Sequence, residues 1–335
     1  MALKSISLVT GGAGFIGSHV VGELIKKNHK VVILDDLSGG FKENINPKAT
    51  FVKGSITHSK LLEKLFEKYQ FDYVFHLAAY AAEGLSHFIR RYNYVNNLIG
   101  SINLINLSVK YNIERFIFTS SIAVYGTNQT PFTEKTIPHP EDPYGISKYA
   151  VELDLQNAKN IFGLPYTIFR PHNVYGIRQN IADPFRNVVG IFMKQILQNY
   201  PLTIFGNGKQ TRAFSYIDDV APYIANCINI KKSENKIFNI GSDSQYTVLE
   251  IAKLVSKYMN VKNNIKFLDK RNEVEHAFSN HEFAQKIFKI KSMTSLDEGI
   301  KKTTQWVKNT KMNKSKIHFK LELDKNLPES WKAYF

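Results

Sequence analysis

The first glycine-rich stretch of the chain reads Thr10-Gly11-Gly12-Ala13-Gly14-Phe15-Ile16-Gly17. The apolar run Ile6-Ser7-Leu8-Val9 precedes it, and residues 18–28 have the pattern of a helix that follows it. In a strand, glycine turn and helix of this kind, side chains at Gly11, Gly14 and Gly17 would block the tight turn, an approaching pyrophosphate, or the packing of helix on strand. The N-terminus of such a helix presents unpaired N–H groups and its positive dipole end to phosphate. The stretch therefore predicts a dinucleotide site.

A second apolar run, residues 31–34, ends in Asp35. This is about the spacing at which an acidic residue binds the ribose hydroxyls of NAD. Because a carboxylate repels a 2′-phosphate, Asp35 favours NAD over NADP. We therefore predict NAD as the cofactor.

The composition is that of a globular protein. The 335 residues are 43% apolar and 13% aromatic, enough for one large or two modest domains. The single cysteine, Cys227, excludes an internal disulfide framework and supplies no thiolate metal site. No apolar run is long enough to span a bilayer, and the first residues pass directly into a strand, which leaves no room for a signal peptide. We expect a cytoplasmic protein that uses neither a metal nor a membrane.

The formal charge of +15 raises the possibility of a nucleic-acid or membrane partner. Most lysines are scattered at helix-surface spacings, however, and only residues 301–325 concentrate them. We interpret them as a solvated basic face that also attracts a phosphorylated substrate, and we expect no nucleic-acid partner.

Apolar runs alternate with helical patterns through the first half of the chain. Strands are predicted at residues 6–10, 31–35, 51–54, 72–78, 115–121 and 166–171, and helices at 18–28, 59–69, 93–111 and 147–162. This alternation predicts an α/β fold, a Rossmann-type doubly wound parallel sheet with ligands at the carboxyl ends of its strands. After residue 171 the regularity fades, with a strand expected at 236–241 and helices at 217–229 and 248–259. We predict an NAD-binding domain of residues 1–172, also including about 213–230, and a smaller C-terminal α/β substrate-binding lobe of residues 173–335.

Tyr144 and Lys148 are the most informative pair of side chains. Residues four apart share one face of a helix, so the phenol and the ammonium would point the same way. A nearby cation favours the phenolate and lowers the pKa of the tyrosine, which makes Tyr144 a usable base and acid for a substrate hydroxyl. Ser121, at the end of the predicted strand 115–120, would hold the same substrate oxygen. We predict Tyr144, Lys148 and Ser121 as the catalytic residues.

With these motifs, nearly the whole chain resembles the extended short-chain dehydrogenase/reductases. It is most similar to the NAD-dependent nucleotide-sugar epimerases typified by UDP-glucose 4-epimerase. The stretches Phe75-His76-Leu77-Ala78-Ala79 and Arg170-Pro171-His172-Asn173-Val174-Tyr175-Gly176 fit the family pattern, as does the segment 294–306. The resemblance implies that NAD is bound by Gly11, Gly14, Phe15, Ile16, Gly17, Asp35, Asp36, Ser38, Gly39, Ser55, Ile56, Leu77, Ala78, Ala79, Asn96, Tyr144, Lys148 and His172.

The resemblance also implies which residues bind the substrate. Arg212 and Arg271 match the two arginines that bind the diphosphate in the family, and planar guanidinium groups suit phosphate oxygens. Phe278 aligns with the position that gates substituents at C2 of the hexose, which favours UDP-glucose and UDP-galactose over an N-acetylated sugar. The implied substrate-binding residues are Ser121, Asn173, Asn187, Val188, Arg212, Arg271 and Phe278.

Three positions depart from the family pattern. Ser55 stands where the family has an aspartate that binds adenine, so adenine recognition is expected to weaken. Asn280 replaces a later aspartate, and Ala81 replaces a lysine near the nicotinamide. We expect these departures to affect how tightly NAD and substrate are held.

The residues before Val124 help to choose the reaction. Related 4,6-dehydratases carry an Asp-Glu pair there, whereas this chain has Ile122-Ala123, which cannot transfer protons. Epimerisation at C4 of a UDP-hexose through a transient 4-keto sugar is therefore expected, with no net redox change. A UDP-glucuronate epimerase, with Arg178 and Arg186 meeting the carboxylate, and a UDP-N-acetylglucosamine epimerase remain alternatives.

A nucleotide-sugar dehydratase or reductase is less favoured, as is a non-catalytic NAD-binding protein that binds RNA through its basic surface. The family also implies a homodimer that buries the helices at 93–111 and 147–162.

Overall fold

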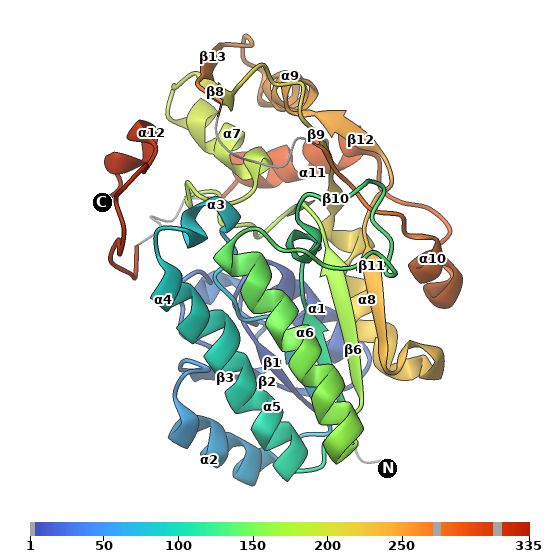
Figure 1. Ribbon diagram of the computed structural model, residues 1–335. Helices are drawn as coiled ribbons and strands as arrows, with labels where there is room; N and C mark the ends of the chain where they lie inside the picture. Colours follow the sequence, from blue (N-terminus) through green and yellow to red (C-terminus); the bar gives the residue numbers. More distant parts are fainter. Residues whose placement is uncertain (1–3, 271–275, 311–316) are drawn as a thin grey trace.

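A seven-stranded parallel sheet forms the centre of the protein, seen here in a computed structural model that describes residues 4–270, 276–310 and 317–335. The strand order is β11-β6-β5-β4-β1-β2-β3, and all neighbouring strands are parallel (Figure 1). The strands are β1 (Ile6–Thr10), β2 (Lys30–Asp35), β3 (Thr50–Lys53), β4 (Tyr73–His76), β5 (Arg115–Thr119), β6 (Tyr166–Pro171) and β11 (Lys236–Ile240). The chain reverses direction across the sheet between β1 and β4, as in a doubly wound fold. The predicted fold class is confirmed.

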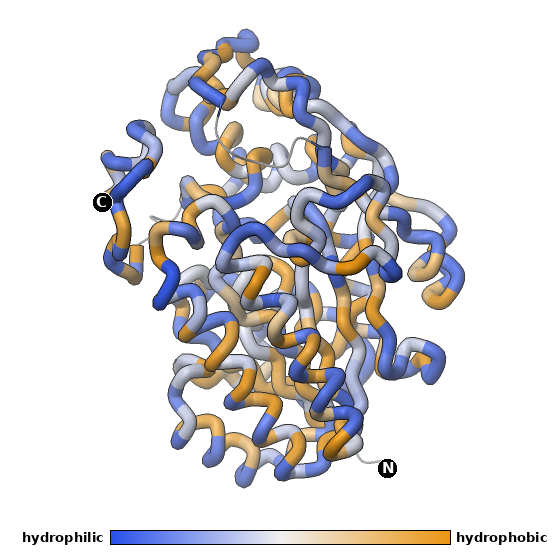
Figure 2. The backbone as a smooth tube through the Cα atoms, viewed as in Figure 1, coloured by the Kyte–Doolittle hydropathy of each residue, from blue (hydrophilic) through white to orange (hydrophobic). Residues whose placement is uncertain are grey.

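Helices cover both faces of this sheet. On one face α1 (Phe15–Lys26) packs beside α8 (Ala221–Asn226), and on the other lie α2 (Ser59–Tyr69), α5 (Gly100–Lys110) and α6 (Pro143–Phe162). Leu8 and Val9, neighbours in β1, enter the two different hydrophobic clusters because successive strand side chains point to opposite faces. Figure 2 shows the same arrangement: the outer helices alternate hydrophobic and hydrophilic residues along their length.

The described residues between 173 and 310, apart from α8 and β11, form a second part of the protein that we term the substrate-side lobe. It is built from small sheets and three longer helices. The helices are α7 (Val188–Leu197), α9 (Val248–Met259) and α11 (Leu296–Lys308), and α9 contacts the other two. Helix α9 begins with a capping box. The Thr247 hydroxyl accepts from the N–H of Glu250, and the Glu250 carboxylate accepts from the N–H of Thr247. The small sheets are β8 (Leu202–Phe205) with β13 (Ile265–Leu268), β7 (Val174–Tyr175) with β10 (Ser215–Tyr216), and β12 (Gln245–Thr247), β9 (Thr211–Ala213) and β14 (His276–Ala277).

Several predicted boundaries are corrected by the structure. Helix α6 begins at Pro143 instead of residue 147, because the Asp142 side chain accepts from the N–H of Gly145 and caps it. The helix expected at 93–111 is instead α4 (Arg90–Tyr94), a π-helical turn (Val95–Ile99) and α5. The helix expected at 217–229 contains only the short α8, with a 3-10 turn at each end.

The predicted division of the chain at residue 172 stays a prediction, with two observations that qualify it. Strand β11, assigned from sequence to the second lobe, pairs with β6 in the large sheet. The C-terminal segment, which includes α12 (Glu329–Lys332), contacts α3 (Glu83–Ser86) and α4 of the first domain. No helix among the described residues is long and apolar enough to cross a membrane, and the cytoplasmic location stays a prediction.

Candidate active site

A cleft of about 980 Å³ opens over the carboxyl ends of the central strands. It runs from the glycine turn after β1 to the substrate-side lobe. All of the predicted NAD-binding residues line it, from Gly11 to His172, and so do the predicted catalytic residues Tyr144, Lys148 and Ser121. Of the predicted substrate residues, Ser121, Asn173, Asn187, Val188 and Arg212 also line the cleft. The structure therefore brings together predicted residues as distant in the chain as Gly11 and Arg212.

The glycine turn lies at one end of this cleft and has no room for a side chain at Gly11 or Gly17. Gly11 has a φ of 71°, and a Cβ atom there would lie 2.8 Å from the backbone nitrogen of Ala78. A Cβ atom at Gly17 would lie 2.1 Å from the carbonyl oxygen of Gly11. No side chain caps α1, so the N–H groups of its first turn remain available to a phosphate. This open cradle fits the pyrophosphate of a dinucleotide.

Asp35 ends β2 at the predicted place and is held by the glycine turn itself. Its Oδ2 atom accepts from the N–H of Ala13 at 3.0 Å, and its Oδ1 atom accepts from the N–H of Leu37 at 2.8 Å. Burial raises the pKa of this carboxyl above its usual value, although these N–H donors oppose the shift. Each oxygen retains a further lone pair, so the carboxylate can still accept from ribose hydroxyls.

Ser55 lies in the cleft wall, where its side chain is engaged in a local turn. The Ser55 hydroxyl lies 2.9 Å from that of Thr57 and accepts from the N–H of Thr57 at 3.2 Å. Weakened adenine recognition at Ser55 stays a prediction.

Asn97, which sequence reasoning missed, fixes the segment after β4. Its Oδ1 atom accepts from the N–H of Tyr80 at 2.8 Å, and its Nδ2 atom donates to the Tyr80 carbonyl at 3.0 Å. Asn97 belongs to the π-helical turn, as does Asn96, which lines the cleft. π-Helical turns of this kind occur frequently at functional sites, but periodicity alone does not predict one.

Tyr144 lies in the first turn of α6, facing the cleft beside Ser121. Burial raises the pKa of Tyr144 strongly, the carboxylate of Glu83 adds to this increase, and a hydrogen bond with Ser121 opposes it. The expectation that Lys148 lowers this pKa toward neutrality is therefore wrong for this arrangement, because desolvation outweighs the favourable contacts. Any phenolate at Tyr144 needs positive charge brought close to it.

Lys148 is placed to supply such charge from one turn further along α6. Its Nζ atom donates to the carbonyl of Thr119 at 2.7 Å and lies 5.8 Å from the centroid of the Tyr144 ring. Burial lowers the pKa of Lys148 to about 7, while the carboxylate of Glu152 acts to raise it. The lysine therefore changes charge near neutral pH.

A buried polar network, also missed from the sequence, lies behind this helix. Arg170 of β6 forms a two-pronged ion pair with Glu152 of α6, and the two side chains are 2% and 0% exposed. Glu152 also accepts from the hydroxyl of Ser120 at 2.5 Å. Arg170 donates to the Tyr125 hydroxyl at 2.7 Å, which in turn donates to Asn239 of β11. The sequence did contain a signal for this network. Glu152 follows Lys148 by four residues and therefore lies on the same face of the helix.

His172 lines the cleft and is held by a second histidine. The Nε2 atoms of His172 and His281 lie 2.8 Å apart, while the outer Nδ1 atoms face the carbonyl oxygen of Ala213 at 3.1 Å and the carboxylate of Asp243 at 2.6 Å. Because the Ala213 carbonyl can only accept, the Nδ1 atom of His172 donates to it, and one proton lies between the two Nε2 atoms. Burial and the neighbouring His281 lower the pKa of His172 to about 3, which favours the neutral form of His172.

The predicted substrate residues are held mainly by the substrate-side lobe. Asn187 caps α7 by accepting from the N–H of Val189 at 2.9 Å, and Asn173 donates to the carbonyl of Ala213 at 3.0 Å. Arg212 lies on β9 and lines the cleft. Ala277 lines the cleft, but its neighbour Phe278 is not among the described residues of the lining. Arg271 lies outside the described residues, and both substrate assignments stay predictions.

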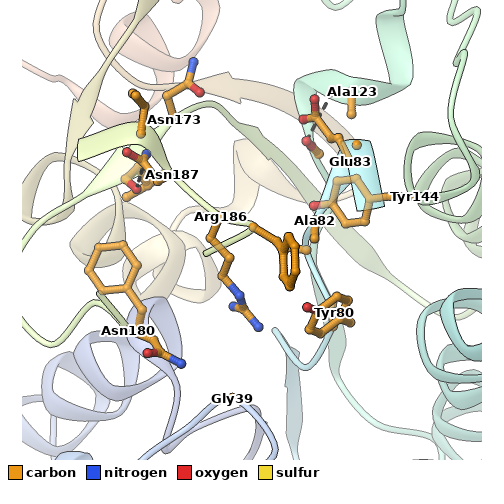
Figure 3. Close-up of a pocket in the computed structure, with 18 of the residues that line it drawn as sticks. Gly39, Tyr80, Ala82, Glu83, Ala123, Tyr144, Asn173, Asn180, Arg186 and Asn187 are labelled. Atoms are coloured by element: carbon orange, nitrogen blue, oxygen red, sulfur yellow. Dashed lines mark hydrogen bonds between the residues drawn. The ribbon is translucent and has the colours of Figure 1, made fainter. Parts of the chain in front are cut away.

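The middle of the cleft holds charges of both signs. Figure 3 shows Glu83, Ala123 and Tyr144 on one side and Asn173 and Asn187 on the other, with Arg186 between them. The Arg186 guanidinium donates to Asp183 at 2.9 Å and lies 5.3 Å from the Tyr80 ring. Glu83 and Arg186 were not predicted as NAD or substrate contacts, although Arg186 was considered as a partner for a sugar carboxylate. Arg178, the other arginine considered, is absent from the described lining and donates to the carbonyl of Ser18.

Comparison with known proteins gives consistent matches. The model of the NAD dependent epimerase/dehydratase family matches residues 7–241. A putative UDP-glucose 4-epimerase of Methanocaldococcus jannaschii is 38% identical over 305 residues, which is 90% of this chain and 98% of that protein. A UDP-glucose 4-epimerase of Thermotoga maritima, solved with UDP-glucose, is 37% identical with a TM-score of 0.86 over 91% of this chain and 99% of that one. A UDP-glucuronic acid 4-epimerase of Bacillus cereus, solved with UDP-glucuronic acid and NAD, is 30% identical with a TM-score of 0.82 over 91% and 99%.

Proposed function

Because the chain belongs to the NAD dependent epimerase/dehydratase family, we propose that it inverts C4 of a UDP-hexose and interconverts UDP-glucose and UDP-galactose. NAD is its cofactor, as in the solved relatives. The observation that carries the proposal is the joint placement of Tyr144, Ser121 and Lys148 in one cleft with Arg212 and the glycine turn.

The residues of this chain divide the chemistry between them. The glycine turn and Asp35 would hold NAD, which would supply reversible hydride transfer at C4 of the sugar. Tyr144 exchanges the proton of the sugar 4-hydroxyl while Ser121 holds the same oxygen, and the Lys148 ammonium stabilises the phenolate. Arg212 holds the diphosphate, which lets the sugar turn about its linkage and present its other face.

The alternative reaction of the family, dehydration, is disfavoured by the residues beside Tyr144. Ile122 and Ala123 lie in the cleft wall and carry no group that can transfer a proton. Inversion at C4 needs no acidic pair at these two positions, because its proton transfer is assigned to Tyr144.

A specific observation also bears on the sugar. The carboxylate of Glu83 raises the pKa of Tyr144 from within the same part of the cleft, so a sugar carboxylate would meet a like charge there. Arg186 favours a sugar that carries a carboxylate, because its guanidinium group lies in the cleft. A UDP-glucuronic acid 4-epimerase is also among the similar structures. UDP-glucuronate is therefore the second candidate substrate, and UDP-N-acetylglucosamine the third.

The reaction is tested by a single hydroxyl deletion. Tyr144→Phe should lower kcat by at least ~100-fold, the low end of general acid–base contributions, with thermal unfolding unchanged. Tyr149→Phe is the matched control, because Tyr149 lies on the same helix and outside the described lining of the cleft. Assays of purified protein with UDP-glucose, UDP-glucuronate and UDP-N-acetylglucosamine in parallel identify the sugar. Near-normal turnover in Tyr144→Phe would refute the assignment.

The proposed enzyme is a homodimer. Support comes from apolar side chains left exposed on the helices that the resemblance places in the interface, namely Ile99 at 48%, Ile146 at 40% and Leu153 at 47%. Light scattering after gel filtration should give twice the 38.3 kDa chain mass, and Leu153→Lys should shift it toward the monomer.

A further inference from the structure

Residues 317–335, which we term the C-terminal strap, run along the edge of the protein beside α3 and α4 (Figure 1). The strap contributes Ser330, Trp331 and Tyr334 to the lining of the cleft. None of these residues belongs to the dinucleotide site or the catalytic group described above. Their position therefore calls for a separate explanation.

The strap is anchored to the NAD-binding domain at its beginning. The Glu322 carboxylate accepts from the N–H groups of Arg91 at 2.7 Å and Tyr92 at 2.8 Å, in the first turn of α4. The N–H of Glu322 donates to the carbonyl of Phe88 at 2.9 Å. The ring of Phe319 lies 5.0 Å from the rings of both Tyr80 and Tyr92.

The end of the strap is anchored to the other side of the cleft. The ring of Phe185 lies 5.2 Å from Trp331, edge to face, and is stacked on Phe335 at 5.7 Å. Phe185 directly precedes Arg186 and Asn187, the residues that enter the cleft and cap α7. Lys194 of α7 also lies over the Tyr334 ring, with its Nζ atom 5.4 Å from the centroid.

Trp331 joins these two anchors. It is 8% exposed and packs with Leu85 of α3 and with Phe185 in one hydrophobic cluster. A Cβ atom added at Gly84 of α3 would lie 3.2 Å from the Trp331 ring. Helix α3 touches the catalytic tyrosine in turn, because the hydroxyl of Ser86 accepts from the N–H of Tyr144 at 3.3 Å.

We propose that the C-terminal strap is a wall of the substrate cleft that positions α3 against the 185–187 segment, with Trp331 and Glu322 as its positioning residues. A tail that only stabilised the fold would need contacts with one domain, whereas this segment contacts both sides of the cleft and lines it. The proposal rests on the proposed function, since the ligand that it helps to hold is a UDP-sugar. Substrate affinity should depend on the strap more than turnover or NAD binding does.

The two tryptophans of the chain allow a direct test. In a Trp306→Phe variant, Trp331 is the single indole, and its fluorescence reports on the strap. Titration with UDP should give a saturable change in emission, with the same midpoint as calorimetric binding of UDP. Calorimetric binding with unchanged emission would refute the strap proposal alone, whereas no calorimetric binding would refute the proposed function and the strap proposal with it.

Enzyme kinetics supply the second test. Trp331→Ala and Glu322→Ala should each raise KM for UDP-glucose about tenfold while kcat changes less than about threefold and bound NAD is retained. Trp331→Phe should restore most of the affinity. Leu323→Ala is the matched control, because this strap side chain is 51% exposed. Unchanged KM in folded Trp331→Ala and Glu322→Ala, or an equal loss in Leu323→Ala, would overturn the proposal.

Discussion

Replacing Lys148 with methionine should change how the stability of the protein depends on pH. The ammonium group is buried, with Lys148 3% exposed, and burial lowers its pKa to about 7. In the unfolded chain the same group returns to an ordinary lysine pKa of about 10.4. Between these two values the unfolded chain binds a proton that the folded chain has released.

The sign and size of the effect follow from this difference. Stability rises with pH wherever the unfolded state binds more protons, so the cost of burying Lys148 is fully present below pH 7 and is relieved as the pH rises toward 10.4. Each pKa unit corresponds to 1.36 kcal/mol, and between pH 7 and pH 9 the relief amounts to about 2–3 kcal/mol. Lys148→Met removes the titrating group and should remove this pH dependence.

Urea unfolding followed by circular dichroism at pH 7 and pH 9 measures the effect. Wild type should gain about 2–3 kcal/mol relative to Lys148→Met between the two pH values. Comparing the two pH values cancels the lost hydrogen bond to Thr119, which both measurements share. Lys64→Met, at an exposed position of α2, should instead run parallel to wild type. A wild-type minus Lys148→Met difference that is the same at both pH values would refute the reasoning.

Two further predictions concern the surroundings of the cleft. Arg170→Met leaves the Glu152 carboxylate buried without its partner and should lower the free energy of unfolding by about 3–5 kcal/mol. The double variant Arg170→Met/Glu152→Met should recover most of this loss, and equal losses in the two variants would contradict the ion-pair account. Gly17→Ala places a Cβ atom 2.1 Å from the Gly11 carbonyl oxygen and should weaken NAD binding by roughly ten- to hundred-fold. The NAD that copurifies with the variant measures this effect, and full stoichiometry of NAD would contradict the prediction.

Local patterns in the sequence were sufficient for the sheet and for most of the cleft. Each strand of the large sheet is a short apolar run, and the residues that end β1, β2, β4, β5 and β6 meet at one edge because parallel strands share their direction. The position of the glycine turn, Asp35 and Ser121 at this edge follows from the strand ends. Tyr144 and Lys148 were predicted from their spacing of four on a helix together with the family resemblance, and the roles of all these residues stay predictions.

The features that were missed depend on contacts between distant segments. The Arg170–Glu152 pair needs the packing of α6 on β6, and the strap needs residues 317–335 to return to α4. The direction of the Tyr144 pKa was wrong because the sequence shows the neighbouring charge of Lys148 but not the extent of burial, and burial dominates. The periodicity of apolar residues in the sequence does not show which distant segments come into contact or how deeply a side chain is buried.

The most direct test of the proposed epimerisation follows one hydrogen atom. Purified protein without added NAD is incubated with UDP-glucose deuterated at C4, and the product is analysed by NMR and mass spectrometry. Retention of deuterium at C4 of UDP-galactose, with no net oxidation, is the predicted result. Formation of a 4-keto-6-deoxy sugar, or exchange of the C4 deuterium with solvent, would contradict the assignment.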